Sequence, residues 1–498
     1  MFSPNLEEVK EIAKNKEFKR IPISYELFSD MATPIEVLRI LKGISRHTYM
    51  LESVEDSKKW GRYTFLGFNP LLEVTCQDGT VKIRGDENFN ELTDDEKIIE
   101  TEKPNEIIRD LVLKNKSPKL KDLPPFTGGF VGYFAYDYIK YQEPSLNLDA
   151  ENQDQFKDID LMLFDKVIAF DNFKQKIIII VNMKTDDLES NYENACNELK
   201  EIADLIKNGK RIDVAPLKLK SDFKPVFSRE KFCDMVEKAK NYIYEGDIFQ
   251  VVLSNKIEAD ISGSLFDTYR VLRTTNPSPY MFYFSSDDIE IAGASPETLV
   301  KLNNDKLYTF PLAGTRPRGK TDEEDEELEK DLLSDEKELA EHNMLVDLGR
   351  NDIGRIAEIG SVKVEKYLSI ERFSHVMHIG STVTGTLRKD LDSLAAIDSI
   401  LPAGTLSGAP KIRACEIINE LEDNKRGIYG GAIGYVDLSG NIDTCISIRI
   451  AFSRNNKVFI RSGAGIVADS VPEKEFEECL NKAAAVIDAL KIADGGLE

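Results

Sequence analysis

The chain is poor in cysteine, histidine and tryptophan, and it has no long apolar run. Its six cysteines include no CxxC pair, and the four scattered histidines predict no zinc site. The longest apolar runs, such as residues 177–181, are as long as a strand, whereas a membrane-spanning helix needs about 20 apolar residues. The charged N-terminus also lacks the apolar core of a signal peptide. We therefore expect a cytoplasmic protein whose thiols are reduced.

Positive charge is also scarce. The chain has 65 Lys and Arg residues against 88 Asp and Glu residues, which gives a net charge of −23 at pH 7. Such a surface repels phosphate backbones and anionic lipids, so neither nucleic acid nor a membrane is expected as a partner. A site for an anionic substrate would need its own positive charge from arginine, lysine, a helix N-terminus or a metal ion.

The composition and the order of the segments indicate a large α+β protein. Hydrophobic residues make up 41% of the chain and charged residues 31%, as in globular proteins, and 498 residues suggest two to three domain-sized units. The segments show no regular β–α alternation and no GxGxxG after a strand. We therefore expect a large antiparallel or mixed β-sandwich flanked by helices.

Several local signals predict individual elements and one boundary. The polar residues 1–20 indicate an amphipathic helix, Thr33 is a possible N-cap for a helix over 34–42, and the QDGT turn at 77–80 predicts a hairpin. Residues 211–228 show little periodicity and read as a connector. This connector divides the chain into an N-terminal domain, 1–215, and a second domain, 225–492.

Two segments with helical spacing each carry a pair of glutamates three residues apart. Glu338 and Glu341 lie on one face of the first predicted helix, and Glu475 and Glu478 lie on one face of the second. Mg²⁺ prefers oxygen ligands and is usually held by one or two carboxylates together with a substrate anion. The alternative is that these glutamates belong to ordinary solvated helix faces.

The second half of the chain also carries glycine-rich turns and isolated polar residues. The turns over 311–319, 401–411 and 461–470 have backbone N–H groups that can approach an anion, although turn chemistry alone explains each of them. His378 is either a structural histidine or an acid or base. Arg449, in an apolar strand, either reaches solvent at a sheet edge or binds a buried anion, and Tyr429 is otherwise a core tyrosine.

Taken together, these segments closely resemble those of the chorismate-utilising enzymes, and within that family the anthranilate synthase component I group. The matching segments, in family order, are PLAGTRPRG, ELAEHNMLVDLGRNDIGRI, HVMHIGSTVTG, LPAGTLSGAPKIRACEII, RGIYGGAIGY, DTCISIRIA and GAGIVADSVPEKEFEE. They extend from about 311 to 480, and weaker matches precede them. The resemblance implies the anthranilate synthase-type fold and places the chorismate site in the 225–492 domain.

The resemblance also implies a role for each matching position. Glu341 and Glu478 would bind Mg²⁺ directly, with Glu338 and Glu475 acting through water, and the metal would hold the ring carboxylate of chorismate. The implied substrate-binding residues are Gly314, Thr315, Tyr429, Arg449, Gly463, Ala464 and Gly465. The implied catalytic residues are His378, which would assist the departing hydroxyl and the later proton removal, and Thr405. Anthranilate and pyruvate would be the products, in the first step of tryptophan biosynthesis.

Two positions separate the members of this family. Enzymes that make isochorismate or salicylate carry a water-activating lysine where this chain has Gln250, and aminodeoxychorismate synthases carry a nucleophilic lysine where it has Ala313. The nucleophile must therefore come from outside, and ammonia fits. The chain shows no glutamine-amidotransferase segment, so a separate glutaminase subunit is implied, in a heterotetramer. The alternatives are an aminodeoxychorismate synthase without the lysine and a non-catalytic tryptophan sensor.

Two further segments resemble the tryptophan feedback site of the family. The first is MLES with Ser53, where Met50 replaces the usual leucine, and the second is NPSPYMF with Pro279, Tyr280 and Met281. The resemblance implies that the end product L-tryptophan binds there and shifts the enzyme between two states. Taken alone, the second segment is also consistent with a proline-rich turn.

Overall fold

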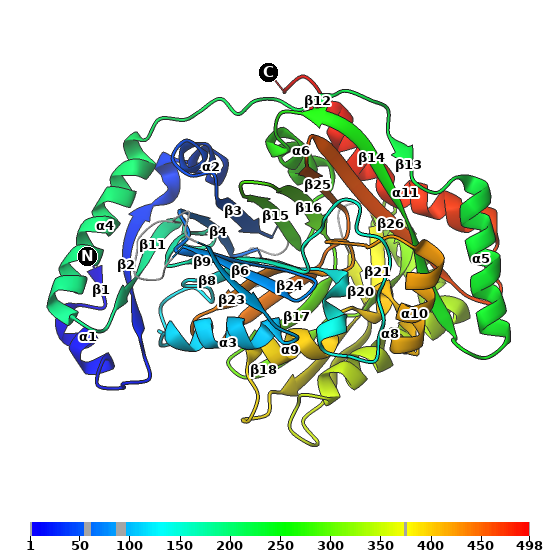
Figure 1. The fold of residues 1–498 in the computed structure, drawn as a ribbon, viewed down its shortest axis with the longest axis horizontal. Helices are drawn as coiled ribbons and strands as arrows, with labels where there is room; N and C mark the ends of the chain where they lie inside the picture. The colour runs from blue at the N-terminus through cyan, green and yellow to red at the C-terminus, as the bar shows by residue number, and fades with distance from the viewer. Residues whose placement is uncertain (1, 54–60, 86–95, 373–375, 498) are drawn as a thin grey trace.

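The structure, a computed structural model, describes residues 2–53, 61–85, 96–372 and 376–497. Two large antiparallel sheets form its centre (Figure 1). The first sheet consists, in spatial order, of β1 (Phe2–Ser3), β2 (Arg20–Phe28), β11 (Lys176–Lys184), β10 (Lys166–Asp171), β4 (Tyr63–Phe68), β3 (Thr48–Glu52), β15 (Tyr280–Ser285), β16 (Glu290–Ser295), β25 (Ile450–Arg454), β26 (Lys457–Ile466), β14 (Gln250–Ser262) and β12 (Lys218–Leu219). The short strands β13 (Lys224–Pro225) and β22 (Gly408–Ala409) also pair with β14.

The second sheet lies against the first. In spatial order it contains β19 (Leu312–Pro317), β21 (Val376–Thr386), β18 (Lys306–Thr309), β17 (Thr298–Asn303), β24 (Ile442–Ile446), β23 (Ala432–Asp437), β8 (Gly129–Phe134), β9 (Ile159–Phe164), β5 (Leu72–Gln77), β6 (Thr80–Gly85) and β7 (Glu96–Glu100), and β20 (Lys363–Arg372) pairs with β21. An aromatic core that includes Phe65, Phe164 and Tyr435 fills the space between the sheets. The predicted α+β sandwich is therefore confirmed.

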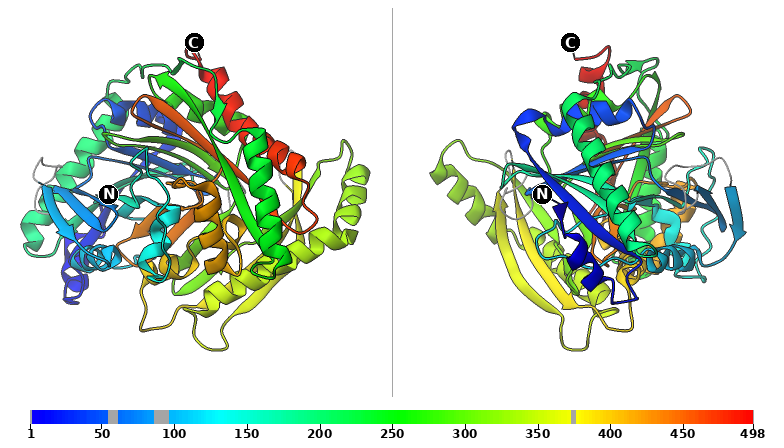
Figure 2. Two further views of the ribbon diagram at one scale, coloured as in Figure 1. Left: turned by 45° about the vertical axis from the view of Figure 1, so that its right-hand side comes forward. Right: turned by 90° about the vertical axis from the view of Figure 1, so that its left-hand side faces the viewer.

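Helices cover the outer faces of both sheets. The first sheet buries apolar residues against α1 (Leu6–Ile12), α2 (Pro34–Lys42), α4 (Leu188–Asn208), α6 (Phe266–Thr275) and α11 (Pro472–Ala493). The second sheet packs against α3 (Pro104–Lys114), α8 (Glu336–Gly354) and α9 (Ser393–Ile400). At one end, α5 (Arg229–Tyr244) and α10 (Lys411–Glu422) cover β14, and Figure 2 shows α5 crossing beside α11. None of the described helices combines the length and apolar character needed to cross a membrane.

The predicted connector separates two stretches of chain that share both sheets. Residues 211–228 contain only the short strands β12 and β13 before α5 begins. Across this connector, β3 pairs with β15 in the first sheet, with Met281 opposite Glu52, and β8 pairs with β23 in the second. Residues 1–215 and 225–492 thus contribute neighbouring strands to each sheet.

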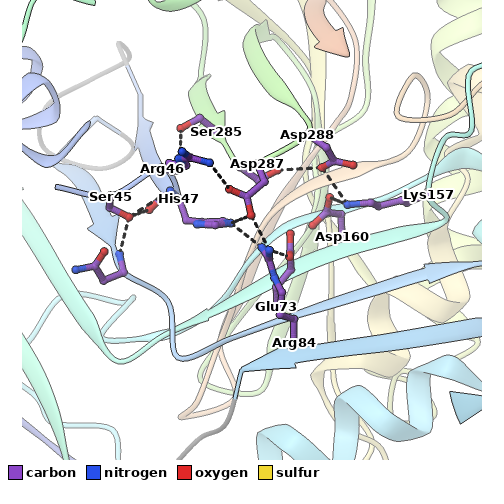
Figure 3. A network of polar contacts seen from close by, with 12 residues as sticks. Ser45, Arg46, His47, Glu73, Arg84, Lys157, Asp160, Ser285, Asp287 and Asp288 are labelled. Carbon is purple, nitrogen blue, oxygen red and sulfur yellow. Dashed lines mark hydrogen bonds and ion pairs between the residues drawn. The ribbon is translucent and has the colours of Figure 1, made fainter. Parts of the chain in front are cut away.

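A network of charged side chains also joins the two sheets (Figure 3). Asp287, in the turn between β15 and β16, lies 2.7 Å from Arg84 of β6 and 3.4 Å from His47. Arg84 also pairs with Glu73 of β5 at 2.7 Å. Beside this group, Lys157 bridges Asp160 and Asp288 at 3.0 and 3.1 Å. The β15–β16 turn of the first sheet is thus fixed to the second sheet by ion pairs.

Candidate active site

Two helices from different layers present the predicted glutamate pairs. Helix α8 packs on β19 and β21 of the second sheet, and Asp335 caps it by accepting hydrogen bonds from the backbone N–H groups of Lys337 and Glu338. Helix α11 packs on β26 of the first sheet and begins with Pro472 at its first position, where a missing N–H group costs nothing. Both helices formed where the sequence predicted them.

The two pairs lie close enough to interact electrostatically. Burial, followed by the nearby carboxylates of Glu338 and Glu478, raises the pKa of Glu341. Burial and the carboxylate of Glu478 likewise raise the pKa of Glu475, while Lys337 of α8 lowers it. Charged groups on α8 and α11 therefore act on one another, so the two acidic faces lie within electrostatic reach of each other. Without a cation between them, these carboxylates repel each other.

The donor set fits a small divalent cation. Glu341 and Glu478 are both exposed, and partial burial of the Glu341 carboxylate raises its pKa. The described residues contain no cluster of three or more His, Cys, Asp or Glu side chains able to enclose a metal. A cation here would be held by few carboxylates and would take water and a substrate anion as its other ligands, which is the usual arrangement for Mg²⁺.

Lys482 connects α11 to the predicted substrate strand. Its ammonium group lies 2.6 Å from Glu478 and donates a hydrogen bond of 3.1 Å to the carbonyl of Gly463. Strand β26 pairs with β25 only as far as Ile460, so Gly463, Ala464 and Gly465 have β14 as their single neighbour in the described sheet. On the side that β25 leaves, this segment pairs with no described strand, although Gly463 and Ala464 are buried.

Side chains lie tightly against the two glycines of this segment. A Cβ atom on Gly463 would come within 3.0 Å of the Tyr429 hydroxyl, and one on Gly465 within 2.6 Å of the Gln250 side-chain nitrogen. Tyr429 is buried, and burial raises its pKa, so its hydroxyl keeps its proton. The structure thus brings Tyr429 and Gln250 against the Gly463–Gly465 backbone.

His378 lies on the second sheet beside the predicted Gly314–Thr315 turn. Its Nδ1 atom is 2.9 Å from the carbonyl oxygen of Gly314 and 3.1 Å from the Thr315 hydroxyl. Nδ1 therefore carries the proton that Gly314 accepts, which leaves a lone pair on Nε2. Burial and the charge of Arg449 lower the pKa of His378, so the ring is neutral at pH 7 and suited to accept a proton.

Gly314 adopts a backbone conformation that favours glycine. Its φ angle is +66°, and the β19–β21 register shifts between Ala313 and Thr315. A Cβ atom at this position would lie 3.3 Å from a carboxylate oxygen of Glu338. Gly314 therefore lies between His378, which is bonded to its carbonyl, and Glu338 of α8.

Arg449 differs from its prediction in one respect. The sequence placed it within an apolar strand, but it lies in the link between β24 and β25 with φ at +52°, a conformation that a non-glycine residue seldom adopts. The side chain is exposed although burial lowers its pKa, and within the described residues its guanidinium has no hydrogen-bond or ion-pair partner. Strained backbone and an unpaired cation together indicate a binding residue.

Glu297 is a further candidate site residue, which the sequence analysis did not identify. It follows β16, and burial raises its pKa to about 7. The hydroxyl of Thr405 donates a hydrogen bond of 3.2 Å to its carboxyl group, and Lys482 also acts on it. The available signal was a single acidic residue within the apolar run IAGASPETLV, which a search for paired carboxylates passes over.

The two segments predicted to bind tryptophan lie side by side in the first sheet. Strands β3 and β15 pair from Thr48 to Glu52, so Ser53 lies one residue beyond the ladder, next to Tyr280 and Pro279. The Tyr280 hydroxyl is bonded to Asp443 and Thr298 of the second sheet at 2.8 and 2.9 Å. The structure thus brings together the four residues that the sequence assigned to one site.

Comparisons with known proteins agree over nearly the whole chain. The family model for chorismate binding enzymes matches residues 50–488. Anthranilate synthase component 1 from Acetivibrio thermocellus is 46% identical over 501 residues and covers 99% of both chains. The protein of the same name from Aquifex aeolicus (strain VF5) is 45% identical over 502 residues, again with 99% of both chains covered.

Solved structures give the same result at the level of the fold. Anthranilate synthase component I from Streptococcus pneumoniae TIGR4 superposes with a TM-score of 0.73 at 37% identity, covering 92% of this chain and 98% of that one. The menaquinone-specific isochorismate synthase from Escherichia coli superposes with a TM-score of 0.68, covering 97% and 98% of the two chains. At 19% identity, this second similarity concerns the fold alone.

Proposed function

We propose that this chain, which belongs to the chorismate-binding enzymes and within them to anthranilate synthase component 1, converts chorismate and ammonia to anthranilate and pyruvate. The observation that carries the proposal is the electrostatic interaction between Glu341 of α8 and Glu478 of α11, together with Arg449, whose guanidinium has no partner among the described residues. A divalent cation site and a separate guanidinium suit a substrate with two carboxylates, as chorismate has.

The binding residues divide between the two carboxylates of chorismate. Glu341 and Glu478, supported by Glu338 and Glu475, would hold Mg²⁺, which when bound neutralises the ring carboxylate and polarises the substrate. Arg449 and Tyr429 would hold the enolpyruvyl carboxylate by a charge-assisted and a neutral hydrogen bond. The backbone of Gly463, Ala464 and Gly465 and the Gly314–Thr315 turn would complete the pocket.

The acid and base roles follow from the protonation states. Glu297, with its pKa at about 7, carries a proton in a substantial fraction of molecules at neutral pH and would donate it to the departing ring hydroxyl. Thr405 would orient that carboxyl group through its hydrogen bond. His378, neutral and with a lone pair on Nε2, would accept the ring proton as the product becomes aromatic.

The nucleophile would be ammonia delivered by a second subunit. Gln250 lies against Gly465 in the pocket, and Ala313 lies on β19 beside Gly314, so neither family position for a lysine nucleophile or base provides an amine. The relatives are named component 1, which indicates that those proteins act with another component. We propose a glutamine amidotransferase as that partner, in a heterotetramer, with ammonium salts able to replace it in vitro.

Feedback inhibition by L-tryptophan is the second part of the proposal. Ser53, Pro279, Tyr280 and Met281 would form the inhibitor site, and their juxtaposition through the β3–β15 pairing supports it. The inhibitor-site residues lie at β3 and β15, whereas the glutamate pairs lie on α8 and α11, so inhibition would act by favouring a state with lower affinity or rate.

An assay of the purified chain with chorismate, Mg²⁺ and ammonium tests the activity. We expect anthranilate fluorescence together with an equal amount of pyruvate, and loss of both products when EDTA is added and recovery when Mg²⁺ is restored. Aminodeoxychorismate as the product would instead favour the alternative enzyme, and no reaction of chorismate would contradict the proposal.

A further inference from the structure

The hydroxyl group of Tyr280 links the two sheets. Tyr280 begins β15 in the first sheet, whereas its hydroxyl lies 2.8 Å from Asp443 of β24 and 2.9 Å from the Thr298 hydroxyl of β17 in the second. Because a carboxylate only accepts, the tyrosine donates to Asp443 and takes its second bond from Thr298. The ring of one proposed inhibitor-site residue is therefore tied to two strands outside that site.

Asp443 and Thr298 are themselves firmly placed. Lys301 lies 2.7 Å from the other side of the Asp443 carboxylate, and Lys301 and Asp443 are register partners in the β17–β24 ladder. The ladder shifts register between Thr298 and Val300, so Thr298 stands at an irregular point. A change in the position of the Tyr280 hydroxyl must break these bonds or move both strands.

Both strands lead directly to proposed active-site residues. Glu297 immediately precedes β17, and its carbonyl accepts a hydrogen bond of 2.9 Å from the backbone N–H of Ile446, the last residue of β24. Arg449 follows β24, and its carbonyl accepts a hydrogen bond from Ala294 of β16. The proposed proton donor Glu297 thus lies directly before β17, and the proposed carboxylate-binding residue Arg449 lies shortly after β24.

A second path leaves Tyr280 through the backbone. Tyr280 is the register partner of Ser295, the last residue of β16. The buried Ser295 hydroxyl donates a hydrogen bond of 2.7 Å to the carbonyl of Ile446. The side chain and the backbone of Tyr280 therefore reach the same junction between β24 and the Glu297 segment.

We infer that the Tyr280 hydroxyl transmits occupancy of the Ser53–Met281 site to Glu297 and Arg449 through Asp443 and Thr298. The inference rests on the proposed regulation by tryptophan. A ligand beside the Tyr280 ring changes the ring position, and the bonds of its hydroxyl carry the change into β17 and β24. Tryptophan would then favour the state in which Glu297 and Arg449 are misplaced.

Replacing Tyr280 by phenylalanine tests the inference, because it keeps the ring and removes the hydroxyl. We expect Tyr280→Phe to bind tryptophan with nearly the original affinity, measured by calorimetry. The factor by which saturating tryptophan inhibits the ammonium-dependent reaction, relative to each variant's own uninhibited rate, should fall from the usual range of about 5 to 150 towards 1. Asp443→Ala, which leaves the inhibitor site unaltered, should have the same effect.

Tyr283→Phe is the matched control. Tyr283 lies on the same strand, but its hydroxyl is bonded to Glu290 of β16 and to Lys42 of α2, which belong to the first sheet and its covering helix. Tryptophan should inhibit Tyr283→Phe by the same factor as it inhibits the unaltered chain. If Tyr280→Phe or Asp443→Ala binds tryptophan and is inhibited fully, the inference is overturned. If the unaltered chain binds no tryptophan, the proposed regulation itself fails.

Discussion

Among single residues, Glu341 is exposed and has an unfavourable charge environment. Its carboxylate is near those of Glu338 and Glu478, which with burial raise its pKa. Neighbouring negative charges destabilise the folded chain unless a cation is bound between them. A glutamate at this position therefore lowers the stability of the metal-free chain but is suited to bind a metal ion. Such a trade of stability for function is common at functional sites.

We predict that Glu341→Gln abolishes Mg²⁺-dependent turnover without lowering the melting temperature of the metal-free chain. The loss of rate should exceed the about 10- to 100-fold typical of residues that act behind a metal ligand. The melting temperature should stay equal or rise, because one repelling charge is removed. Glu336→Gln, in the exposed first turn of the same helix, is the control and should retain full activity.

Glu297 gives the reaction a defined pH dependence. Its pKa is raised to about 7, so the proposed donor is protonated below this value and loses its proton as the pH rises through it. We expect the maximal rate, measured at constant free ammonia, to fall on the alkaline side of about pH 7. Because the folded pKa exceeds the usual value, the same group stabilises the fold below its unfolded pKa, and this contribution disappears as the pH rises through about 7.

Glu297→Gln should remove this alkaline limb and leave a low, pH-independent rate. Its stability should also become less sensitive to pH between about 4.5 and 7, because the titrating group is gone. An alkaline limb that persists unchanged in Glu297→Gln would assign the titration to another group.

Among the secondary-structure elements, the sequence correctly predicted those whose ends are determined by local interactions, such as a helix cap or a tight turn. The helix at 34–42 begins at Thr33 with a full capping box, and the QDGT turn forms with Asp78 and Gly79 at φ of +48° and +85°. Residues 1–20 were wrongly predicted as one helix, because the structure has only Leu6–Ile12 as α1 before β2 begins at Arg20. Helix α1 ends at Ile12 with Ala13 as its C-cap, and turns over 14–19 lead to β2, of which only Arg20 lies within the predicted range.

The paired glutamates and the glycine-rich turns were found by spacing, but the conformation of Arg449 was not. A strand composition surrounds it on both sides, and nothing local indicates a positive φ at an arginine. Glu297 was missed for a related reason, since its pKa depends on enclosure by Thr405 and other segments distant in sequence. Residues whose properties arise from long-range packing leave little trace in the local pattern.

The irregular point of β19 can be tested at Gly314. An alanine there must adopt φ near +66° and brings a Cβ atom to 3.0 Å from Leu332 and 3.3 Å from Glu338. We predict that Gly314→Ala lowers the free energy of unfolding by about 1–2 kcal/mol. Activity should fall further than stability explains, because the carbonyl of Gly314 fixes the tautomer of His378.

Gly354→Ala is the matched control. It makes the same glycine-to-alanine change in α8, the helix that packs on β19. Gly354 ends α8 with open space around its Cβ position and without a positive φ. Alanine should therefore be neutral or stabilise the chain by up to about 1 kcal/mol. Equal effects of the two substitutions on denaturant unfolding would show that the Gly314 conformation is not special.

For the whole molecule, the class of fold followed from the sequence, but the continuity of the sheets did not. The connector at 211–228 is visible as a loss of periodicity, and it is present in the structure. Which strands pair across it depends on register between residues more than 200 positions apart, such as Glu52 and Met281. Alternation of polar and apolar residues identifies a strand and its buried face, but it does not identify the neighbour.

This continuity predicts how the chain unfolds. Removing residues 1–215 would uncover β15 in the first sheet and β23 in the second, each a buried strand with free N–H and C=O groups. The apolar faces shared by Phe65, Phe164 and Tyr435 would also be exposed. We therefore expect fragment 225–492 to aggregate or remain unfolded when expressed alone, as judged by circular dichroism and sedimentation.

Co-expression of 1–215 with 225–492 is the complementary experiment. The two fragments omit only residues 216–224, which include β12 at the edge of the first sheet, so they should assemble and recover ammonium-dependent activity, with tryptophan inhibition restored through the β3–β15 pair. The charged contacts of Asp287 with Arg84 should strengthen this assembly, and salt should weaken it. A soluble 225–492 fragment that unfolds cooperatively by itself would instead show that the second stretch of chain has a complete core of its own.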